Sequence, residues 1–389
     1  MHRFVFQFAI GLVMLFVLSV NAIAQTMSLD SAIAAALRFH PSIKESNALV
    51  AEQQQMQTAA FGLNDPEFSI EVPPAEYAWS VSQEIEFPTT YISRHKLAKA
   101  NTNLAEKQTA VTQAELKMQV RLAYLEMQHA QARLTLVQQQ DTLLAQVAYA
   151  TKRRYNAGDV GLLEQLNAEN AYQSVHMEFV SAQAELQNAQ RQLSLLIGTA
   201  STNPFSVDTL TPIRQGAKTT LTQSPWISWA MQNSNVAKQN WRRERAELMP
   251  DFVVGYFQGT SEAPSRMELG VALPIWFWTY RSRIKAARYR FDQSEQRLQS
   301  TLLEQQSLQQ TLASELLKQQ ARLQYFDQTA LPQAAVLQNA AQRAYAAGEI
   351  GYVEFLQSMQ TAFTNRLNYL DTVRQHNEAV IQLQTLSGL

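Results

Sequence analysis

The sequence of 389 residues contains no cysteine, which excludes a disulfide-stabilised scaffold and any metal site with thiolate ligands. Glycine and proline are scarce, with 12 of each, and their scarcity favours a mainly helical chain. Charged residues make up 17% and the formal net charge is −1. Because nucleic-acid binding needs a basic stripe or patch, this balance gives no argument for a nucleic-acid partner.

Motifs for catalysis and for cofactor binding are also missing. The sequence has neither a glycine-rich phosphate loop nor a Gly-x-Ser-x-Gly nucleophile elbow. The six histidines show no metal-ligand spacing: His2, His40, His95, His129, His176 and His376. We therefore expect no enzyme, no bound cofactor and no resident metal.

Long apolar runs are confined to the N-terminus. Arg3 precedes an apolar stretch at 4–20, and Ala22-Ile23-Ala24 has the small-x-small pattern of a cleavage site. This predicts a secretory signal peptide at 1–24, with an uncleaved membrane anchor as the alternative. No later window has ~18 consecutive apolar residues, so we expect no transmembrane helix in the mature chain.

The sequence repeats itself at an offset of 190 residues. The stretches 150–166 and 340–356 read ATKRRYNAGDVGLLEQL and AAQRAYAAGEIGYVEFL, and eight of their positions are identical. This period is too long for a short solenoid repeat and indicates an internal duplication. We predict structural repeats at 25–198 and 226–389, joined by a linker at 199–225 that is rich in Thr, Ser, Pro and Gln.

Both repeats predict the same order of elements: short helices, a β-hairpin, a long outgoing helix, a tight turn and a returning helix. The seven-residue spacing of Leu97, Leu104 and Val111 indicates a coiled coil, and a helix over 93–155 would span ~95 Å. The expected hairpins lie at about 66–88 and about 250–278. The expected helices cover 29–39, 42–61, 93–155, 162–197, 226–248, 283–345 and 352–386.

Alternation with a period of two predicts a two-faced sheet. Trp79, Val81, Ile85 and Phe87 fall on one face, and the residues between them are polar. Four strands cannot close a barrel, and open edges in lipid leave backbone groups unpaired. If the hairpins enter a membrane, several chains must pool their strands. The alternative is a small soluble β-layer with one solvated face.

The duplicated motif Arg-x-Tyr-x-Ala-Gly-x-x-Gly-x-x-Glu-x-Leu, at 153–166 and 343–356, resembles that of the TolC family of outer-membrane efflux channels. The resemblance covers about 360 residues. It implies a mainly α fold with β: a homotrimer with a 12-stranded transmembrane barrel continued by an α-helical tunnel across the periplasm. It also implies outer-membrane lipid as surroundings and a tripartite pump, with a periplasmic adaptor (membrane fusion protein) and an inner-membrane RND-type transporter.

In this family the glycine turns, here 156–162 and 346–352, form the periplasmic tip of the tunnel. The resemblance therefore implies an adaptor-docking role for Gly158, Gly161, Gly348 and Gly351. The alternative is turn geometry alone, because glycine allows the chain to reverse after a long helix.

The resemblance also implies a gate in the lumen, formed by Glu164, Glu354 and Tyr345. A ring of three Glu354 side chains would favour cations. The sequence departs from the family pattern at Gln357, where a second acidic residue is usual, and at Ile350, where a basic one is usual. The alternative is that both glutamates are solvated residues of a coiled coil.

The hairpin ends SQEIEF at 82–87 and VALPI at 271–275 resemble the CzcC-type, heavy-metal branch of the family. Pro88-Thr89-Thr90-Tyr91 replaces the glycine-lysine-arginine run that usually follows. We expect passive conduction of substrates from the periplasm to the exterior, with metal cations favoured over drugs. The competing hypothesis is a periplasmic coiled-coil adaptor or scaffold without a pore.

Overall fold

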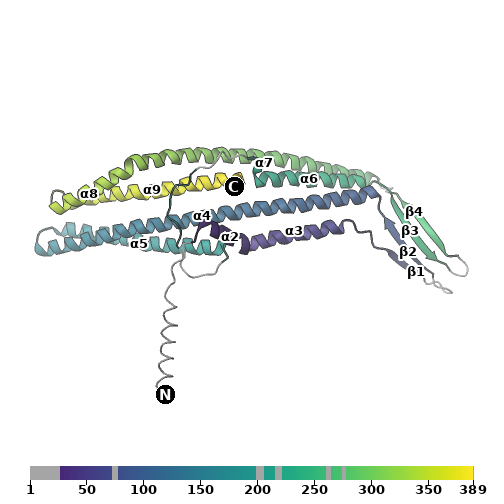
Figure 1. Cartoon of the computed structure of the whole chain (residues 1–389), viewed down its shortest axis with the longest axis horizontal. Coiled ribbons are helices and arrows are strands. Elements are labelled where there is room, and N and C mark those ends of the chain that lie inside the picture. The colour runs from purple at the N-terminus through teal and green to yellow at the C-terminus, as the bar shows by residue number, and fades with distance from the viewer. Residues whose placement is uncertain are drawn as a thin grey trace, which may run out of the picture. The chain divides into compact units, whose positions relative to one another are not determined.

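The computed structural model describes residues 27–71, 78–198, 206–214, 221–259, 264–273 and 277–388. The predicted signal peptide lies outside them. The described chain is mainly helical with four strands (Figure 1). Its elements are α2 Leu29–Phe39, α3 Pro41–Ala59, β1 Glu67–Glu71, β2 Ala78–Ile85, α4 Pro88–Ala157, α5 Leu162–Leu196, the 3₁₀ turn η1 Leu221–Gln223, α6 Pro225–Ala246, β3 Asp251–Gln258, β4 Arg266–Ala272, α7 Phe277–Tyr325, the π-helix η2 Phe326–Ala330, α8 Leu331–Ala347 and α9 Tyr352–Leu386.

The chain forms two compact units, and each takes segments from both sequence repeats. The first, here called the sheet unit, contains the described residues within 41–115, 217–311 and 383–388. The second, here called the hairpin unit, contains those within 27–40, 116–216 and 312–382. The long helices α4 and α7 contribute to both units, because the boundary between units falls within them.

The sheet unit contains one antiparallel sheet with strand order β1-β2-β3-β4. The two predicted hairpins therefore join through β2 and β3, with Val81 opposite Tyr256. Polar contacts connect the helices beside it in the order α3, α4, α6 and α7. Thr102 of α4 donates to the Gln53 carbonyl, Gln232 of α6 donates to the Ala100 carbonyl, and Ser234 donates to Glu295 of α7.

The hairpin unit has a core where α4, α5, α8 and α9 meet. Alanines from three different helices, Ala148, Ala168 and Ala341, are buried there and let the backbones approach closely. The larger side chains that fill this core come from α9: Tyr352, Phe355, Met359 and Phe363.

Residues 206–214, the described central part of the predicted linker, are anchored to the hairpin unit. The hydroxyl of Tyr124 lies 3.0 Å from Oδ2 of Asp208 and accepts a hydrogen bond from its backbone N–H. The buried amide of Asn377 accepts from the backbone N–H of Ile213 and donates to the carbonyl of Thr211, both at 2.8 Å. This segment therefore bonds to α4 and α9.

The starts of α4 and α7 and the interruption near Pro332 differ from the sequence prediction. Helix α4 begins at Pro88, because proline at the first helical position gives up only an N–H that has no partner there. Phe277, predicted within a strand, begins α7, and Ile275 lies outside the described residues. The interruption near Pro332 is a π-helix just before it, which relieves the clash between a proline ring and the carbonyl four residues earlier.

Candidate functional site

The turns that end α4 and α8 have the same geometry, and each requires glycine. Gly158 has φ +82° and Gly348 has φ +74°, a left-handed conformation that side chains disfavour. The N–H of Asp159 donates to the carbonyl of Arg154, and the N–H of Glu349 donates to that of Ala344. Both are Schellman caps, so the local turn explains these two glycines.

Gly161 and Gly351 are different, because neither needs to be glycine for its own chain. Gly161 caps α5 with φ −81°, a value open to any residue, and Gly351 does not have a positive φ either. An added Cβ at either position meets no atom within 4 Å. Turn geometry therefore does not account for this pair.

The structure brings two of the predicted gate residues together. The hydroxyl of Tyr345, on α8, donates to Oε1 of Glu164, on α5, at 3.3 Å. Arg154 of α4 lies near the same carboxylate, with Nη1 3.8 Å from Oε1. Residues from both sequence repeats thus meet at one carboxylate.

The third predicted gate residue, Glu354, does not join this contact. It lies in the first turn of α9, where a carboxylate suits the positive end of the helix dipole. Its side chain is exposed, and no hydrogen bond or ion pair to it occurs among the described residues. The two glutamates therefore have different surroundings, although the repeat makes them equivalent in sequence.

Two aromatic residues beside the contact have no place in the predicted gate. Phe355 stacks on Tyr345 with ring centroids 4.6 Å apart, and the Tyr352 hydroxyl donates to the Asn167 carbonyl at 3.4 Å. Burial, together with Tyr345 and Glu164, raises the pKa of Tyr352 to about 12. Comparing the repeats could indicate these positions, because the first repeat has Leu162 and Gln165 there.

The start of α5 exposes three leucines, and the first of them stands where α9 buries Tyr352. Leu162 is 52% exposed, Leu163 78% and Leu166 47%. Their spacing of three and four residues places Leu166 on the same helix face as the other two. The result is an apolar surface beside Gly161.

The sheet has one apolar face and one polar face. All its exposed large apolar side chains lie on one face, because they pair with one another across the register: Phe68, Ile70, Trp79, Val81, Phe252, Tyr256, Met267, Leu269 and Val271. The other face carries Ser69, Ser80, Ser82, Glu84 and Glu268, together with the partly buried Val253 and Phe257. This confirms the predicted alternation.

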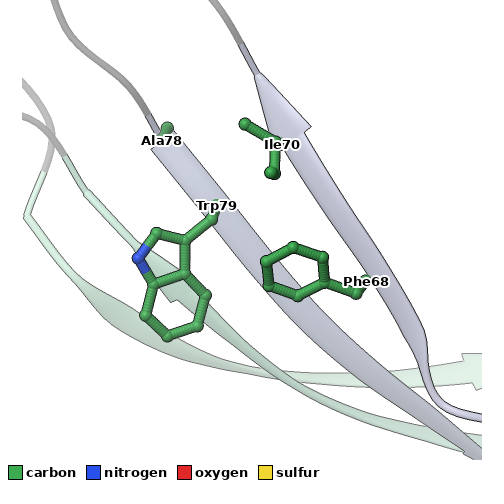
Figure 2. A pocket seen from close by; sticks show the side chains of 4 residues that line it. All are labelled: Phe68, Ile70, Ala78 and Trp79. Carbon is green, nitrogen blue, oxygen red and sulfur yellow. The ribbon is translucent and has the colours of Figure 1, made fainter.

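A hollow of about 320 Å³ lies on the apolar face between β1 and β2 (Figure 2). Phe68, Ile70, Ala78 and Trp79 line it. The rings of Phe68 and Trp79 are tilted, with centroids 6.1 Å apart. Its lining is almost entirely apolar, so it suits hydrocarbon better than a polar ligand.

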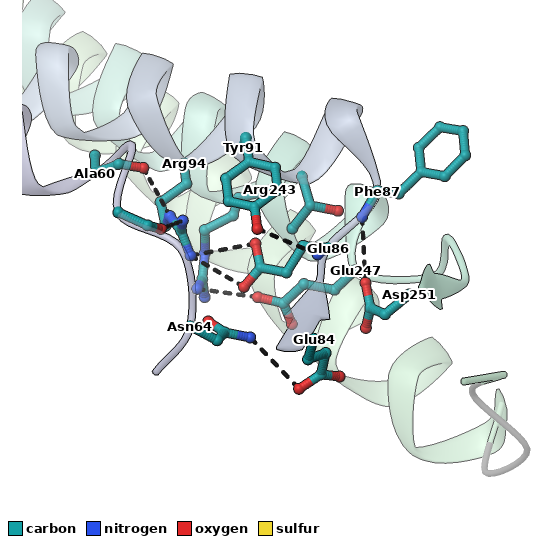
Figure 3. A network of polar contacts seen from close by, with 12 residues as sticks. Ala60, Asn64, Glu84, Glu86, Phe87, Tyr91, Arg94, Arg243, Glu247 and Asp251 are labelled. Carbon is teal, nitrogen blue, oxygen red and sulfur yellow. Dashed lines mark hydrogen bonds and ion pairs between the residues drawn. The ribbon is translucent and has the colours of Figure 1, made fainter. Parts of the chain in front are cut away.

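A polar network joins the sheet to the helices that follow it (Figure 3). Arg94 of α4 donates to both oxygens of Glu86, at 3.0 and 3.2 Å, and to the carbonyls of Ala60 and Gly62. In the second repeat, Arg283 of α7 pairs with Glu244 and Glu247 at the end of α6. In each repeat an arginine early in the outgoing helix therefore binds the end of the incoming helix.

No group of three or more His, Asp or Glu side chains that could hold a metal ion occurs in the part of the chain that the structure describes. None of the helices described combines the length and apolar character needed to cross a membrane.

A two-faced sheet continued by long paired helices defines a channel subunit of the TolC type. The family model for outer membrane efflux proteins matches residues 67–199 and 217–389, so the chain belongs to the outer membrane efflux protein family. The chain is a component of an outer-membrane efflux channel that extends into the periplasm, and its family supplies the outer-membrane component of tripartite efflux pumps. This confirms the predicted family, channel function and localisation.

Individual relatives agree with this assignment. The cobalt-zinc-cadmium resistance protein CzcC of Cupriavidus metallidurans is 25% identical over 305 residues, covering 76% of this chain and 73% of CzcC. The outer membrane protein VceC from Vibrio cholerae has a similar fold, with TM-score 0.78, 16% identity and coverage of 92% and 96%. The structure of CusC gives TM-score 0.73 at 18% identity, with coverage of 94% and 95%.

Proposed function

We propose that three copies of this chain pool their sheets into a 12-stranded barrel, so that the pore belongs to the trimer. The observation that carries this proposal is the four-stranded sheet itself, with one apolar exposed face and with β1 and β4 as its two outer strands. Unpaired strand edges cost several kcal/mol per backbone group in lipid. Pairing β1 of one copy with β4 of the next removes these edges and turns the apolar faces toward lipid.

The two faces of the sheet provide a direct test. Because the chain has no cysteine, Leu269→Cys and its neighbour Glu268→Cys each give a single labelling site, on the apolar and the polar face. We expect an environment-sensitive dye at 269 to be quenched by lipid-soluble quenchers in vesicles and a dye at 268 by water-soluble ones. Equal quenching at both positions, or a purified particle with the mass of one chain, would contradict the trimeric barrel.

The family and the geometry of the two glycine turns support a proposal for how this channel joins a pump. We propose that the glycine turns dock a periplasmic adaptor, which connects the channel to an inner-membrane RND-type transporter. The open space around Gly161 and Gly351 and the exposed leucines at 162, 163 and 166 support docking there. An adaptor helix with small and apolar side chains would suit this surface.

We propose that Glu164 and Tyr345 form part of a gate near the tip. Their hydrogen bond joins the two helical hairpins of one chain, so breaking it removes a contact that holds the hairpins together. Glu354 remains in the proposal as an exposed carboxylate whose ring in a trimer would attract cations. Loss of the Tyr345 hydroxyl should therefore favour the open channel.

Metal cations are the proposed substrates, conducted passively and without catalysis. The likeness to a protein named for cobalt, zinc and cadmium resistance supports this class over drugs. The experiment is to express the chain with its cognate adaptor and transporter in a metal-sensitive host that lacks this pump. Restored tolerance to these three metals is expected, whereas tolerance to drugs alone would contradict the assignment.

A further inference from the structure

The two long helices that leave the sheet begin with segments that are basic and free of acidic residues. In α4 the first acidic residue is Glu106, and in α7 it is Asp292. In the segments before them, 88–105 and 277–291, arginine and lysine are the only charged residue types. Because both repeats have this composition at the same place in the fold, it calls for a physical explanation.

Internal ion pairs account for part of this charge. Arg94 and Arg283 are bound to carboxylates within the sheet unit, as described above. Five other basic side chains are exposed and make no ion pair among the described residues: Lys96, Lys99, Lys285, Arg288 and Arg290. The four that lie at matching distances from the starts of the two helices are here called the basic collar: Lys96, Lys99, Lys285 and Arg288.

The collar residues occupy the same position in the two helices. Lys96 and Lys99 lie 8 and 11 residues after Pro88, and Lys285 and Arg288 lie 8 and 11 residues after Phe277. Their Cα atoms are therefore ~12 and ~17 Å from the start of each helix. Side chains on a helix lean toward its N-terminus, which here is the end at the sheet. The charged groups thus lie nearer the sheet than their Cα atoms.

The collar side chains remain exposed beside the packed faces of the two helices. In the part of α7 before residue 300 the buried residues are Ala287 and Ser294, and in α4 they include Ala100 and Thr102. Exposed aromatic rings accompany the collar, since Trp278 is 52% exposed and Tyr289 71%. Trp and Tyr near basic residues are typical of the boundary between hydrocarbon and water.

We propose that the basic collar binds the phosphate groups of anionic phospholipids in the periplasmic leaflet. This rests on the proposed function, in which the apolar sheet face lies in the outer membrane. Continuity with that face places the collar just beyond the hydrocarbon, and its charge complements lipid phosphate. Each basic residue near a membrane surface favours anionic lipid about fivefold. The collar fixes the depth of the sheet in the bilayer and selects the lipids around it.

The experiment uses the purified full-length protein in detergent with equal amounts of phosphatidylglycerol and phosphatidylethanolamine, and native mass spectrometry counts the bound lipids. We expect a preference for phosphatidylglycerol of at least about fivefold. In the variant with Lys96, Lys99, Lys285 and Arg288 changed to Gln, the ratio should fall to about one. The matched control changes Lys107, Lys117, Lys318 and Arg322 to Gln, which removes the same charge from the same two helices, and should keep the preference.

The possible outcomes separate this inference from the proposed function. An unchanged preference in the collar variant, or a preference lost equally in the control, overturns the inference. Adding inorganic phosphate should not displace the lipid, and displacement at equal concentration would show a site for free phosphate instead. If the dye at Leu269→Cys is not quenched from lipid, the proposed membrane position fails. Quenching there without any lipid preference overturns the collar alone.

Discussion

The hydroxyl of Tyr345 donates a hydrogen bond to Oε1 of Glu164 over 3.3 Å and connects the two sequence repeats near their turns. The equivalent residues, Tyr155 and Glu354, do not form such a hydrogen bond among the described residues. Tyr155, the counterpart of Tyr345, has no described hydrogen bond from its hydroxyl, and Glu354, the counterpart of Glu164, is exposed. Duplication followed by divergence has thus kept this tyrosine–glutamate hydrogen bond at one of its two possible positions, and the Tyr352 hydroxyl, which donates to the Asn167 carbonyl, provides a second contact between the hairpins.

The Tyr345→Phe variant tests whether this hydrogen bond keeps the tip closed. The variant keeps the ring that stacks on Phe355 and removes only the hydroxyl. A hydrogen bond to a partly exposed carboxylate contributes about 1 kcal/mol, so the separated state should become about fivefold more populated. Single-channel recordings in planar bilayers should show a correspondingly higher open probability.

Tyr155→Phe is the matched control for that experiment, because it removes the same hydroxyl from the other repeat. It should leave the recordings unchanged. If both variants behave alike, or if Tyr345→Phe has no effect while Glu164→Gln opens the channel, the hydrogen bond is not the closing contact.

The four motif glycines should separate into two classes on substitution. Gly158→Ala and Gly348→Ala place a side chain in the left-handed region and should each destabilise the fold by about 1–2 kcal/mol. Gly161→Ser and Gly351→Ser should leave the melting temperature unchanged or raise it, because serine is a preferred helix N-cap. Thermal unfolding of the purified protein measures both effects.

Although serine at positions 161 and 351 should not destabilise the fold, it should weaken binding of the adaptor. A serine side chain there enters the open space that we assign to the adaptor, so binding of the cognate adaptor should weaken by tenfold or more, or about 1.4 kcal/mol. Surface plasmon resonance with the adaptor provides the measurement. Full binding by the folded Gly161→Ser/Gly351→Ser variant would remove these glycines from the docking surface.

Much of the fold was predictable because its elements are long and strongly periodic. The repeat offset placed both glycine turns correctly, and alternation at 79–87 identified the apolar face of the sheet. The π-helix at Phe326–Ala330 was not predictable in detail, since Pro332 indicates an interruption but not its form. The Glu164–Tyr345 contact depends on how two hairpins pack, and spacing within either hairpin does not specify that.

The surroundings of the two equivalent glutamates, Glu164 and Glu354, could not be predicted from the sequence either. Sequence equivalence predicts one role for Glu164 and Glu354, but Tyr352 and Phe355 turn into the core while Leu162 and Gln165 do not. A difference in two neighbouring residues thus changes what a repeated motif position contacts. The family resemblance indicated the region, and the packing decided which residue met which partner.

We expect substitution of Arg94, which pairs with Glu86, to destabilise the sheet unit more than substitution of Arg266, which pairs with Glu268. The Arg94 guanidinium binds Glu86 and two backbone carbonyls, so Arg94→Gln leaves several acceptors unpaired and should cost about 2–3 kcal/mol of unfolding free energy. Arg266, which pairs with Glu268 at an exposed site, is the control, and Arg266→Gln should cost less than about 1 kcal/mol. Urea unfolding followed by circular dichroism compares them, and equal costs would contradict the bridging role.

His129 should make the hairpin unit less stable in mild acid. Its Nε2 donates to Asp371 across the α4–α9 contact, with Glu126 and Arg374 close by. Burial lowers the pKa of His129 below 6.5, although Asp371 opposes the shift. Because the native pKa lies below the unfolded one, the unfolded chain binds more protons as pH falls through 6.5, and stability decreases. We expect the melting temperature to drop by a few degrees between pH 7.5 and pH 5.5, and His129→Gln to reduce that drop. A drop of the same size in His129→Gln would assign the acid sensitivity to another group.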